Sequence, residues 1–279
     1  MGDLWAGTLT RMRSIPTSPV SYFLRDGWFE ADKRGPELAV NDLLGRRVEI
    51  RYSGDIHCVA CGRSTTKTFY QGFCFPCSQS RAEADICIVK PELCHHGDAS
   101  NPCRDELFAQ TQCFQPHVLY AALTSGVKIG ITRRPNIPSR WIDQGAVRAI
   151  PLAEMPSRRE VGLVEVRLAE SYADKTHWMR MLKEKDPEGD LAAAARELVR
   201  DLGVMGVDGV LPESDRREFT FDYPVLEYPT KVRSFNLDKT PEVAGELRGV
   251  KGQYLIFDTA VINVRKYTGY KVTIGLEDA

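Results

Sequence analysis

The sequence predicts an α+β protein, and three observations support this class. Short alternating or apolar runs bounded by Gly and Pro occur near both ends of the chain. All eight cysteines lie between Cys58 and Cys113. The part after them combines two strand-like runs with segments of helical periodicity. We therefore expect an N-terminal β segment (1–56), a cysteine-rich module (57–116), a mixed core (117–205) and a C-terminal β segment (206–279).

The two terminal segments are expected to form one small β-domain. Strand-like runs cover 5–9, 20–24 and 47–51 at one end, and "KGQYLIFD", "AVINVRKY" and "YKVTIGL" at the other. The ends also echo each other. The sequence "AGTL" at 6–9 resembles "AGEL" at 244–247, and 22–26 resembles 254–258, since both are aromatic runs that end in Asp. Chance similarity between amphipathic strands is the alternative.

Composition and charge set broad limits on function. The 279 residues are 43% hydrophobic and 27% charged, an ordinary globular balance that suits one to three domains. A net charge of −1 provides no global attraction to nucleic acid, so any such contact depends on local patches. The chain shows no secretory signal and no apolar run of membrane-spanning length, so we expect a cytoplasmic protein without a membrane partner. The sequence does not indicate an oligomeric state.

Four of the cysteines form two CxxC pairs, and this spacing predicts a structural zinc site. Twelve residues separate the pairs, which are Cys58 with Cys61 and Cys74 with Cys77. Two thiolates in one tight turn hold one side of a tetrahedral ion, and a second such turn completes the set. Gly62, directly after the first pair, suits the turn. A redox-active CxxC is the alternative.

The other four cysteines are spaced less regularly, and they predict a second zinc site with less support from spacing. They are Cys87, Cys94, Cys103 and Cys113, and His95, His96 and His117 lie among them. Buried free thiols and an iron–sulfur cluster are the alternatives. If all four thiols bind metal, His95 and His96 are expected to be loop residues.

The segment after the cysteines reads as two strands followed by helices. "VLY" at 118–120 and "KIG" at 128–130 are separated by a Ser-Gly turn. Ser157 followed three residues later by Glu160 predicts a helix start, and a second helix is expected from Asp190 to Gly203.

These motifs resemble the GIY-YIG nuclease superfamily. "VLY" stands at the first strand motif, "KIG" at the second, Arg140 on the following helix, and "VGLVEVRLAESYADKTH" resembles the helix that carries the family's Glu. About 60 of the 279 residues are covered. The resemblance implies phosphodiester cleavage in which Tyr120 helps to activate the nucleophile, Arg140 holds the phosphate and Glu165 holds Mg²⁺ or Mn²⁺. The sequence departs from the pattern at Lys128, where a divergent branch also has Lys, and at His177, which stands near the family's late Asn.

A second group of residues is expected to bind the substrate. Under the resemblance, Gly130 lets the substrate backbone approach the sheet. Arg133, Arg134 and Trp141 suggest a basic face with an aromatic platform. Asp143 or Gln144 is expected to orient Arg140, and Gln144 is also counted among the substrate-binding residues. Each residue also has an ordinary structural explanation: Tyr120 and Trp141 as core, Arg140 as a surface residue, and Glu165 as exposed or paired with Arg140.

Three functions are consistent with these residues. The first is a metal-dependent phosphodiesterase, or a degenerate relative, that acts on DNA or RNA. The second is a non-catalytic zinc-containing protein that binds nucleic acid. The third is a biosynthetic enzyme that uses the same pocket for a small molecule. The whole chain also resembles an uncharacterised bacterial family with a cysteine-rich module, a "KIGITR…RWIDQGA" core and a "KGQYLIFD…NVRKYTGY" end.

Overall fold

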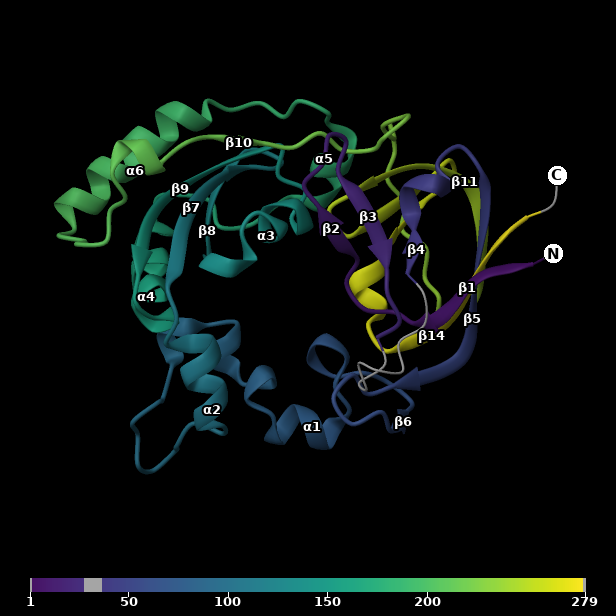
Figure 1. Cartoon of the computed structure of the whole chain (residues 1–279), viewed down its shortest axis with the longest axis horizontal. Helices are drawn as coiled ribbons and strands as arrows, with labels where there is room; N and C mark the ends of the chain where they lie inside the picture. Colours follow the sequence, from purple (N-terminus) through teal and green to yellow (C-terminus); the bar gives the residue numbers. More distant parts are fainter. Residues whose placement is uncertain (1, 28–36, 278–279) are drawn as a thin grey trace. The chain divides into compact units, whose positions relative to one another are not determined.

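The protein is a mixed α+β chain with antiparallel sheets that form two compact units (Figure 1). A computed structural model describes residues 2–27 and 37–277. Unit 1 comprises Met1–Gln79 and Asp222–Ala279, and unit 2 comprises Ser80–Phe221. Unit 2 is thus an insertion between the two halves of unit 1. The 57–116 segment, expected as one module, is divided at Ser80, with four cysteines on each side.

Unit 1 contains a seven-stranded sheet built from both ends of the chain. The strands in spatial order are β1 (Asp3–Thr8), β14 (Tyr270–Leu276), β5 (Arg47–His57), β11 (Glu242–Lys251), β12 (Tyr254–Phe257) and β13 (Val261–Asn263), with β6 (Ser64–Thr65) beside β5. All of these pairs are antiparallel. The pairing of β1 with β14 confirms that the N- and C-terminal segments form one β structure.

A smaller sheet and short helices complete unit 1. The sheet contains β2 (Arg13–Ile15), β3 (Ser21–Leu24) and β4 (Leu38–Ala39), and the helix α1 (Phe75–Ser80) begins in this unit. "YKVTIGL" forms the predicted strand β14, but "AVINVRKY" does so only in its first half. Its second half is a 3₁₀ helix, Val264–Tyr267, because the Asn263 side chain accepts a hydrogen bond from the Lys266 N–H at 3.3 Å and caps it.

The sequence echo between the two ends corresponds to a repeated local contact. Asp26 Oδ1 accepts a hydrogen bond from the N–H of Thr8 at 2.9 Å. Asp258 Oδ1 accepts one from the N–H of Glu246, the matching position, at 3.1 Å. In each copy a Gly precedes the donor, and a Cβ on it would lie 3.1 Å from Asp26 Cγ or 2.6 Å from Asp258 Oδ1. Gly245 is therefore required for Asp258 to approach, whereas a Cβ on Gly7 would first meet the Trp5 ring, at 2.7 Å.

Unit 2 is built on a four-stranded antiparallel sheet. The order is β10 (Phe219–Thr220), β9 (Arg148–Met155), β7 (His117–Leu123) and β8 (Val127–Arg133). Its helices are α2 (Glu106–Phe108), α3 (Ser139–Asp143), α4 (Arg158–Leu168), α5 (Trp178–Lys183) and α6 (Leu191–Val204). The predicted helix starts are confirmed: the Ser157 hydroxyl accepts from the Glu160 N–H, and Asp190 caps α6. In the described part of the chain, no helix is both long and apolar enough to cross a membrane.

Both faces of this sheet are covered, and the central strand β7 is buried along its whole length. Leu119, Ala121 and Leu123 join one apolar cluster with residues of α4 and α6. Tyr120 and Ala122 point to the other face and pack with Trp141 of α3. Figure 1 shows α4 and α6 on one side of the sheet and α3 on the other. This alternation is the period of two that a strand imposes on its side chains.

Tyr120 packs directly over Gly130, its cross-strand neighbour in the β7–β8 hairpin. A Cβ on Gly130 would lie 2.6 Å from the Tyr120 hydroxyl oxygen and 2.7 Å from Cζ. The Tyr120 side chain is fully buried, and its ring makes an edge contact with Trp141 at 5.7 Å between centroids. Gly130 is therefore needed because the tyrosine ring occupies the space of a side chain.

This contact predicts that Gly130→Ala destabilises unit 2 by about 1–3 kcal/mol, because the ring must move out of a packed core. Gly203→Ala is the matched control, since Gly203 lies in α6 and a Cβ there meets nothing within 4 Å. The control should gain about 0.5–1 kcal/mol of stability. Chemical denaturation of both variants measures the difference, and an equally tolerated Gly130→Ala would contradict the packing of the ring over Gly130.

Candidate functional site

The β7–β8 hairpin presents three of the predicted site residues on one face of the sheet. Tyr120 pairs with Gly130 and Ala122 pairs with Lys128, and residues directly opposite each other in an antiparallel pair point to the same side. Tyr120, Gly130 and Lys128 therefore share the face that packs against α3. The helix α3 contributes Arg140, and Gln144 lies directly after its end.

A chain of hydrogen bonds links Tyr120 to Arg140 through Gln144. The Tyr120 hydroxyl lies 2.9 Å from the Gln144 amide. When the amide nitrogen is placed as the donor to this hydroxyl, the amide oxygen accepts from Arg140 Nη2 at 3.1 Å and from Nε at 3.3 Å. This orientation satisfies all three groups. Gln144 therefore holds two guanidinium donors of Arg140 in a fixed direction.

Lys128 is a nearly buried cation within this group. Its side chain donates to the backbone carbonyl of Asp174 at 2.8 Å, and the residue is only 6% exposed. Burial lowers the pKa of Lys128 to about 8, and the positive charge of Arg140 acts in the same direction. The negative charge of Glu165 opposes both effects. Lys128 therefore changes its charge close to neutral pH, which an exposed lysine does not.

Glu165 is the acidic member of the group, and it lies half-buried on α4. Burial raises its pKa, the positive charge of Lys128 lowers it, and the negative charge of Asp174 raises it again. Arg140 also acts on Glu165 and on Tyr120, whose own pKa is raised mainly by burial. We call Tyr120, Lys128, Arg140, Gln144 and Glu165 the core cluster. Hydrogen bonds join Tyr120, Gln144 and Arg140, and charge effects couple Lys128 and Glu165 to Arg140.

Two predicted site residues have structural contacts instead of places in the core cluster. Trp141 is fully buried and packs on Phe219 at 5.1 Å between ring centroids. A side chain with no exposed surface cannot serve as a stacking platform, so Trp141 belongs to the core. His177 is exposed and caps α5, where its Nδ1 accepts from the Arg180 N–H at 3.2 Å.

Arg133 and Arg134 lie at the opposite end of β8 from Lys128. Arg133 pairs with His117 at the start of the hairpin, and Arg134 forms an ion pair with Glu154. Arg133 lies five positions along the extended strand from Lys128, a distance of roughly 17 Å. These arginines therefore do not extend the core cluster into one continuous basic face. Burial lowers the pKa of the neighbouring His117 to about 4, so this histidine is neutral.

The first four cysteines converge in unit 1 as their spacing predicts. The Sγ atoms of Cys58, Cys61, Cys74 and Cys77 lie within 4.8 Å of one another. Cys61 Sγ and Cys74 Sγ are 3.8 Å apart, which is roughly the separation of two sulfur atoms bonded at about 2.3 Å to one tetrahedral zinc ion. Gly62 has a φ of +69°, so it takes the left-handed turn predicted for it. The group is consistent with one structural zinc.

The pKa values of these thiols are also consistent with a bound metal ion. Burial raises the pKa of Cys58, but the N–H groups of Cys74, Cys61 and Ala60 outweigh it and lower the value to about 6. The pKa of Cys77 is raised to about 12 by burial and by its neighbouring thiols. Four close thiolates repel one another, so all four can lose their protons together only when a cation offsets their charge.

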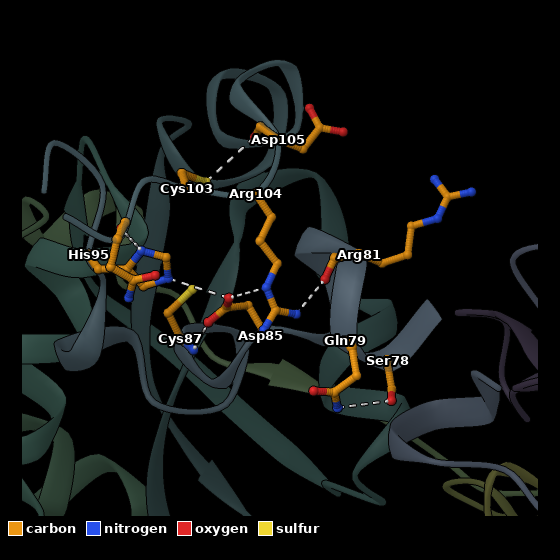
Figure 2. Close-up of polar contacts among 10 residues, drawn as sticks. Ser78, Gln79, Arg81, Asp85, Cys87, His95, Cys103, Arg104 and Asp105 are labelled. Atoms are coloured by element: carbon orange, nitrogen blue, oxygen red, sulfur yellow. Dashed lines mark hydrogen bonds and ion pairs between the residues drawn. The ribbon is translucent and has the colours of Figure 1, made fainter. Parts of the chain in front are cut away.

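The last four cysteines line one cavity in unit 2. Cys87, Cys94, Cys103 and Cys113 all border it, together with Asp85, His95 and His96. Within the described residues, the ligand atoms of Asp85, Cys87 and His95 lie within 4.8 Å of one another. The second zinc site predicted from all four thiols stays a prediction, and Figure 2 shows that an aspartate and a histidine share this space.

The comparison with known families now bears on the chain as a whole. A sequence profile described as "Protein of unknown function (DUF2797)" matches residues 45–272. The chain belongs to this family. The matched range covers both groups of cysteines and the whole core cluster of this chain. No curated protein and no solved structure matches the chain.

Sequence reasoning missed Asp174 in this DUF2797 chain. Its carbonyl accepts from Lys128, and its carboxylate raises the pKa of Glu165. Asp174 lies after α4, and the neighbouring Ala173 carbonyl accepts from the Ile129 N–H at 2.8 Å, which fixes this segment along the edge of β8. No motif marks Asp174, because its position depends on this long-range pairing.

The four-thiol group predicts that Cys74→Ser removes about one zinc ion per chain and lowers the thermal stability of the protein, since a three-thiolate remnant holds a structural zinc more weakly. Elemental analysis and thermal unfolding of the purified protein measure both effects. Ala60→Ser is the control, because it adds a hydroxyl within the same turn and keeps all four thiols. Equal zinc content in the two variants would refute the site.

Proposed function

We propose that unit 2 binds the phosphodiester backbone of DNA or RNA at the core cluster and cleaves it with a divalent cation, in the manner that the GIY-YIG resemblance implies. The observation that carries this proposal is the charge content of the cluster. Two cations, Lys128 and Arg140, act electrostatically on Glu165, and so does the carboxylate of Asp174. Lys128 is buried, Arg140 and Glu165 are half-buried, and Asp174 is exposed. A phosphodiester carries one negative charge and suits the cations, while a divalent metal ion suits the carboxylates.

Arg140 is the residue best prepared to hold a phosphate. Two of its five N–H donors are directed at Gln144, and Gln144 is in turn held by Tyr120. A guanidinium with a fixed direction loses less conformational entropy when it binds an anion than a freely rotating one. Lys128 adds a second positive charge when it is protonated, below a pH of about 8.

Glu165 is the residue that would hold Mg²⁺ or Mn²⁺, with Asp174 as its acidic neighbour. Burial and the charge of Asp174 both raise the pKa of Glu165. A bound divalent cation offsets both effects, so the two carboxylates fit such an ion. Magnesium commonly binds through one or two carboxylates and keeps several water molecules. When bound, the cation supplies a more acidic water and neutralises charge on the phosphate.

In this proposal, Tyr120 positions Gln144 and does not contact the substrate. The sequence resemblance implies that Tyr120 helps to activate the nucleophile, but the side chain is fully buried and its pKa is raised by burial. A phenol without exposed surface does not reach a substrate in this conformation. We therefore assign contact with the phosphate to Arg140 and Lys128, and assign to Tyr120 the support of Gln144.

The same burial of Tyr120 favours one second function. A protein that grips phosphate through Arg140 and Lys128 without cleaving it needs no exposed phenol. This non-catalytic nucleic-acid-binding function predicts affinity that falls with added salt and does not depend on Glu165.

Cleavage and binding assays on single-stranded, duplex and branched DNA and RNA, with Mg²⁺ or Mn²⁺, test both functions. Glu165→Ala should reduce cleavage about 100-fold or more and leave binding within a few-fold, because it removes the metal ligand and keeps the cations. Arg140→Ala should weaken binding as well. Glu170→Ala is the control, since it removes an exposed carboxylate just beyond α4.

The outcomes separate the functions. Cleavage lost in Glu165→Ala and kept in Glu170→Ala supports the nuclease. Salt-sensitive binding without cleavage, unchanged in Glu165→Ala, supports the non-catalytic protein. A wild-type protein that neither binds nor cleaves any of these substrates contradicts both, and small-molecule substrates then become the class to test.

A further inference from the structure

The cavity in unit 2 brings together several side chains that bind soft metal ions. It is bordered by Cys87, Cys94, Cys103, Cys113 and His95. A second, adjoining cavity is bordered by Cys87, Cys94 and Cys113 but not by Cys103. The three shared cysteines therefore lie in the wall between the two cavities, while Cys103 lies on one side only.

His95 has the hydrogen-bond arrangement of a metal-binding histidine. Its Nδ1 lies 2.7 Å from the carbonyl oxygen of Asn101. A carbonyl can only accept, so Nδ1 carries the proton, and in the neutral ring Nε2 presents a lone pair. Histidines that bind metals typically donate their other ring N–H to a carbonyl or carboxylate, which fixes the ring.

The Nε2 lone pair of His95 faces another acceptor. Asp85 Oδ2 lies 3.4 Å from it, and both side chains are largely buried, at 15% and 7% exposure. Two acceptors at this distance repel each other unless a proton or a metal ion lies between or beside them. The thiol of Cys87 is the third member of this group, with all three ligand atoms within 4.8 Å of one another. Figure 2 shows the three side chains pointing toward one another.

The Asp85 carboxylate already accepts hydrogen bonds from other groups. Its Oδ2 accepts from Arg104 Nε at 2.9 Å, and its Oδ1 accepts from the Cys87 N–H at 3.3 Å. The His96 side chain already contacts another group, since its Nε2 lies 2.9 Å from Glu106 Oε2. The remaining cysteine, Cys103, points away from His95 and donates to the Asp105 carbonyl at 3.6 Å (Figure 2). These contacts leave Cys87, Cys94, Cys113 and His95 as candidate ligands. Cys87 and His95 belong to the close group, whereas Cys94 and Cys113 border the same cavity and would have to approach a bound ion.

We infer that Cys87, Cys94, Cys113 and His95 bind a second zinc ion in unit 2, with Asp85 and Cys103 outside the ligand set. Three thiolates and one histidine are a common tetrahedral set for structural zinc. Binding releases the three thiol protons to solvent, and the ion then provides the positive charge that His95 Nε2 and the thiolates face. This set differs from the four-cysteine set that spacing alone predicts.

The site would fix the position of the helix that carries Glu165. The cysteine segment contacts α4 at two points: the Arg158 side chain donates to the Ile88 carbonyl, and Gly162 packs on Pro91. A Cβ on Gly162 would lie 2.5 Å from Pro91 Cβ, so the approach is close. Between residues 81 and 101, this segment consists of short 3₁₀ helices and turns whose backbone hydrogen bonds are local. A metal ion that cross-links its turns therefore holds the surface against which α4 rests.

Metal counting on the full chain tests the ligand set. Wild-type protein purified with zinc should hold about two zinc ions per chain. Cys87→Ser and His95→Ala should each lower the content to about one, whereas Cys103→Ser, the matched control, should keep both. If His95→Ala keeps two ions and Cys103→Ser keeps one, the four-cysteine set is correct and the inference is overturned. One zinc in the wild type also overturns it.

Cobalt gives a reading that does not depend on the stability of the Cys87 and His95 variants. A double variant with Cys58→Ser and Cys74→Ser keeps only two thiols at the first site, so it should bind Co²⁺ only at the second. Its sulfur-to-cobalt charge-transfer absorption should correspond to three thiolates, about three quarters of that expected for a four-thiolate site. Absorption for four thiolates, or no cobalt binding in a protein that keeps its fold by circular dichroism, contradicts the inference.

Discussion

The packing of Tyr120 over Gly130 is the constraint on which the core cluster depends. The Tyr120 ring fills the space that a side chain at position 130 of β8 would otherwise occupy. Its hydroxyl group lies within hydrogen-bonding distance of the Gln144 amide. Gln144 in turn directs Arg140. A larger residue at 130 would displace the ring and, with it, this whole series of contacts. One glycine therefore determines where the guanidinium of α3 points.

Burial makes the charges of the cluster depend on one another. Lys128 loses part of its proton affinity because it is desolvated and lies near Arg140, while Glu165 gains proton affinity because it is desolvated and lies near Asp174. Each change is partly offset by the opposite charge across the cluster. A bound anion stabilises the protonated lysine, and a bound cation stabilises the ionised glutamate. If the proposed function holds, ligands of both signs together would therefore bind here better than either alone.

The sequence predicts the local features well, because they depend on near neighbours. The four-thiol group, the turn at Gly62, the Ser157 and Asp190 helix caps and the β7–β8 hairpin all depend on residues a few positions apart or on a regular spacing. The similarity between the chain ends also predicts that the terminal segments form one β structure, although it does not predict which strands pair. The sequence does not predict contacts that depend on long-range packing. The burial of Trp141, the capping by His177 and the place of Asp174 depend on α3, α5 and the segment beside β8.

The central claim is that Tyr120 acts on phosphate only through Arg140, and a double-mutant cycle tests it most directly. The affinity for a short single-stranded oligonucleotide is measured for wild type, Tyr120→Phe, Arg140→Lys and the double variant. We expect each single substitution to weaken binding. The double variant should bind within about twofold of Arg140→Lys, because substitutions within one hydrogen-bonded chain have effects on the binding free energy that do not add. If the two losses multiply, Tyr120 acts on the ligand independently of Arg140, and the account is contradicted.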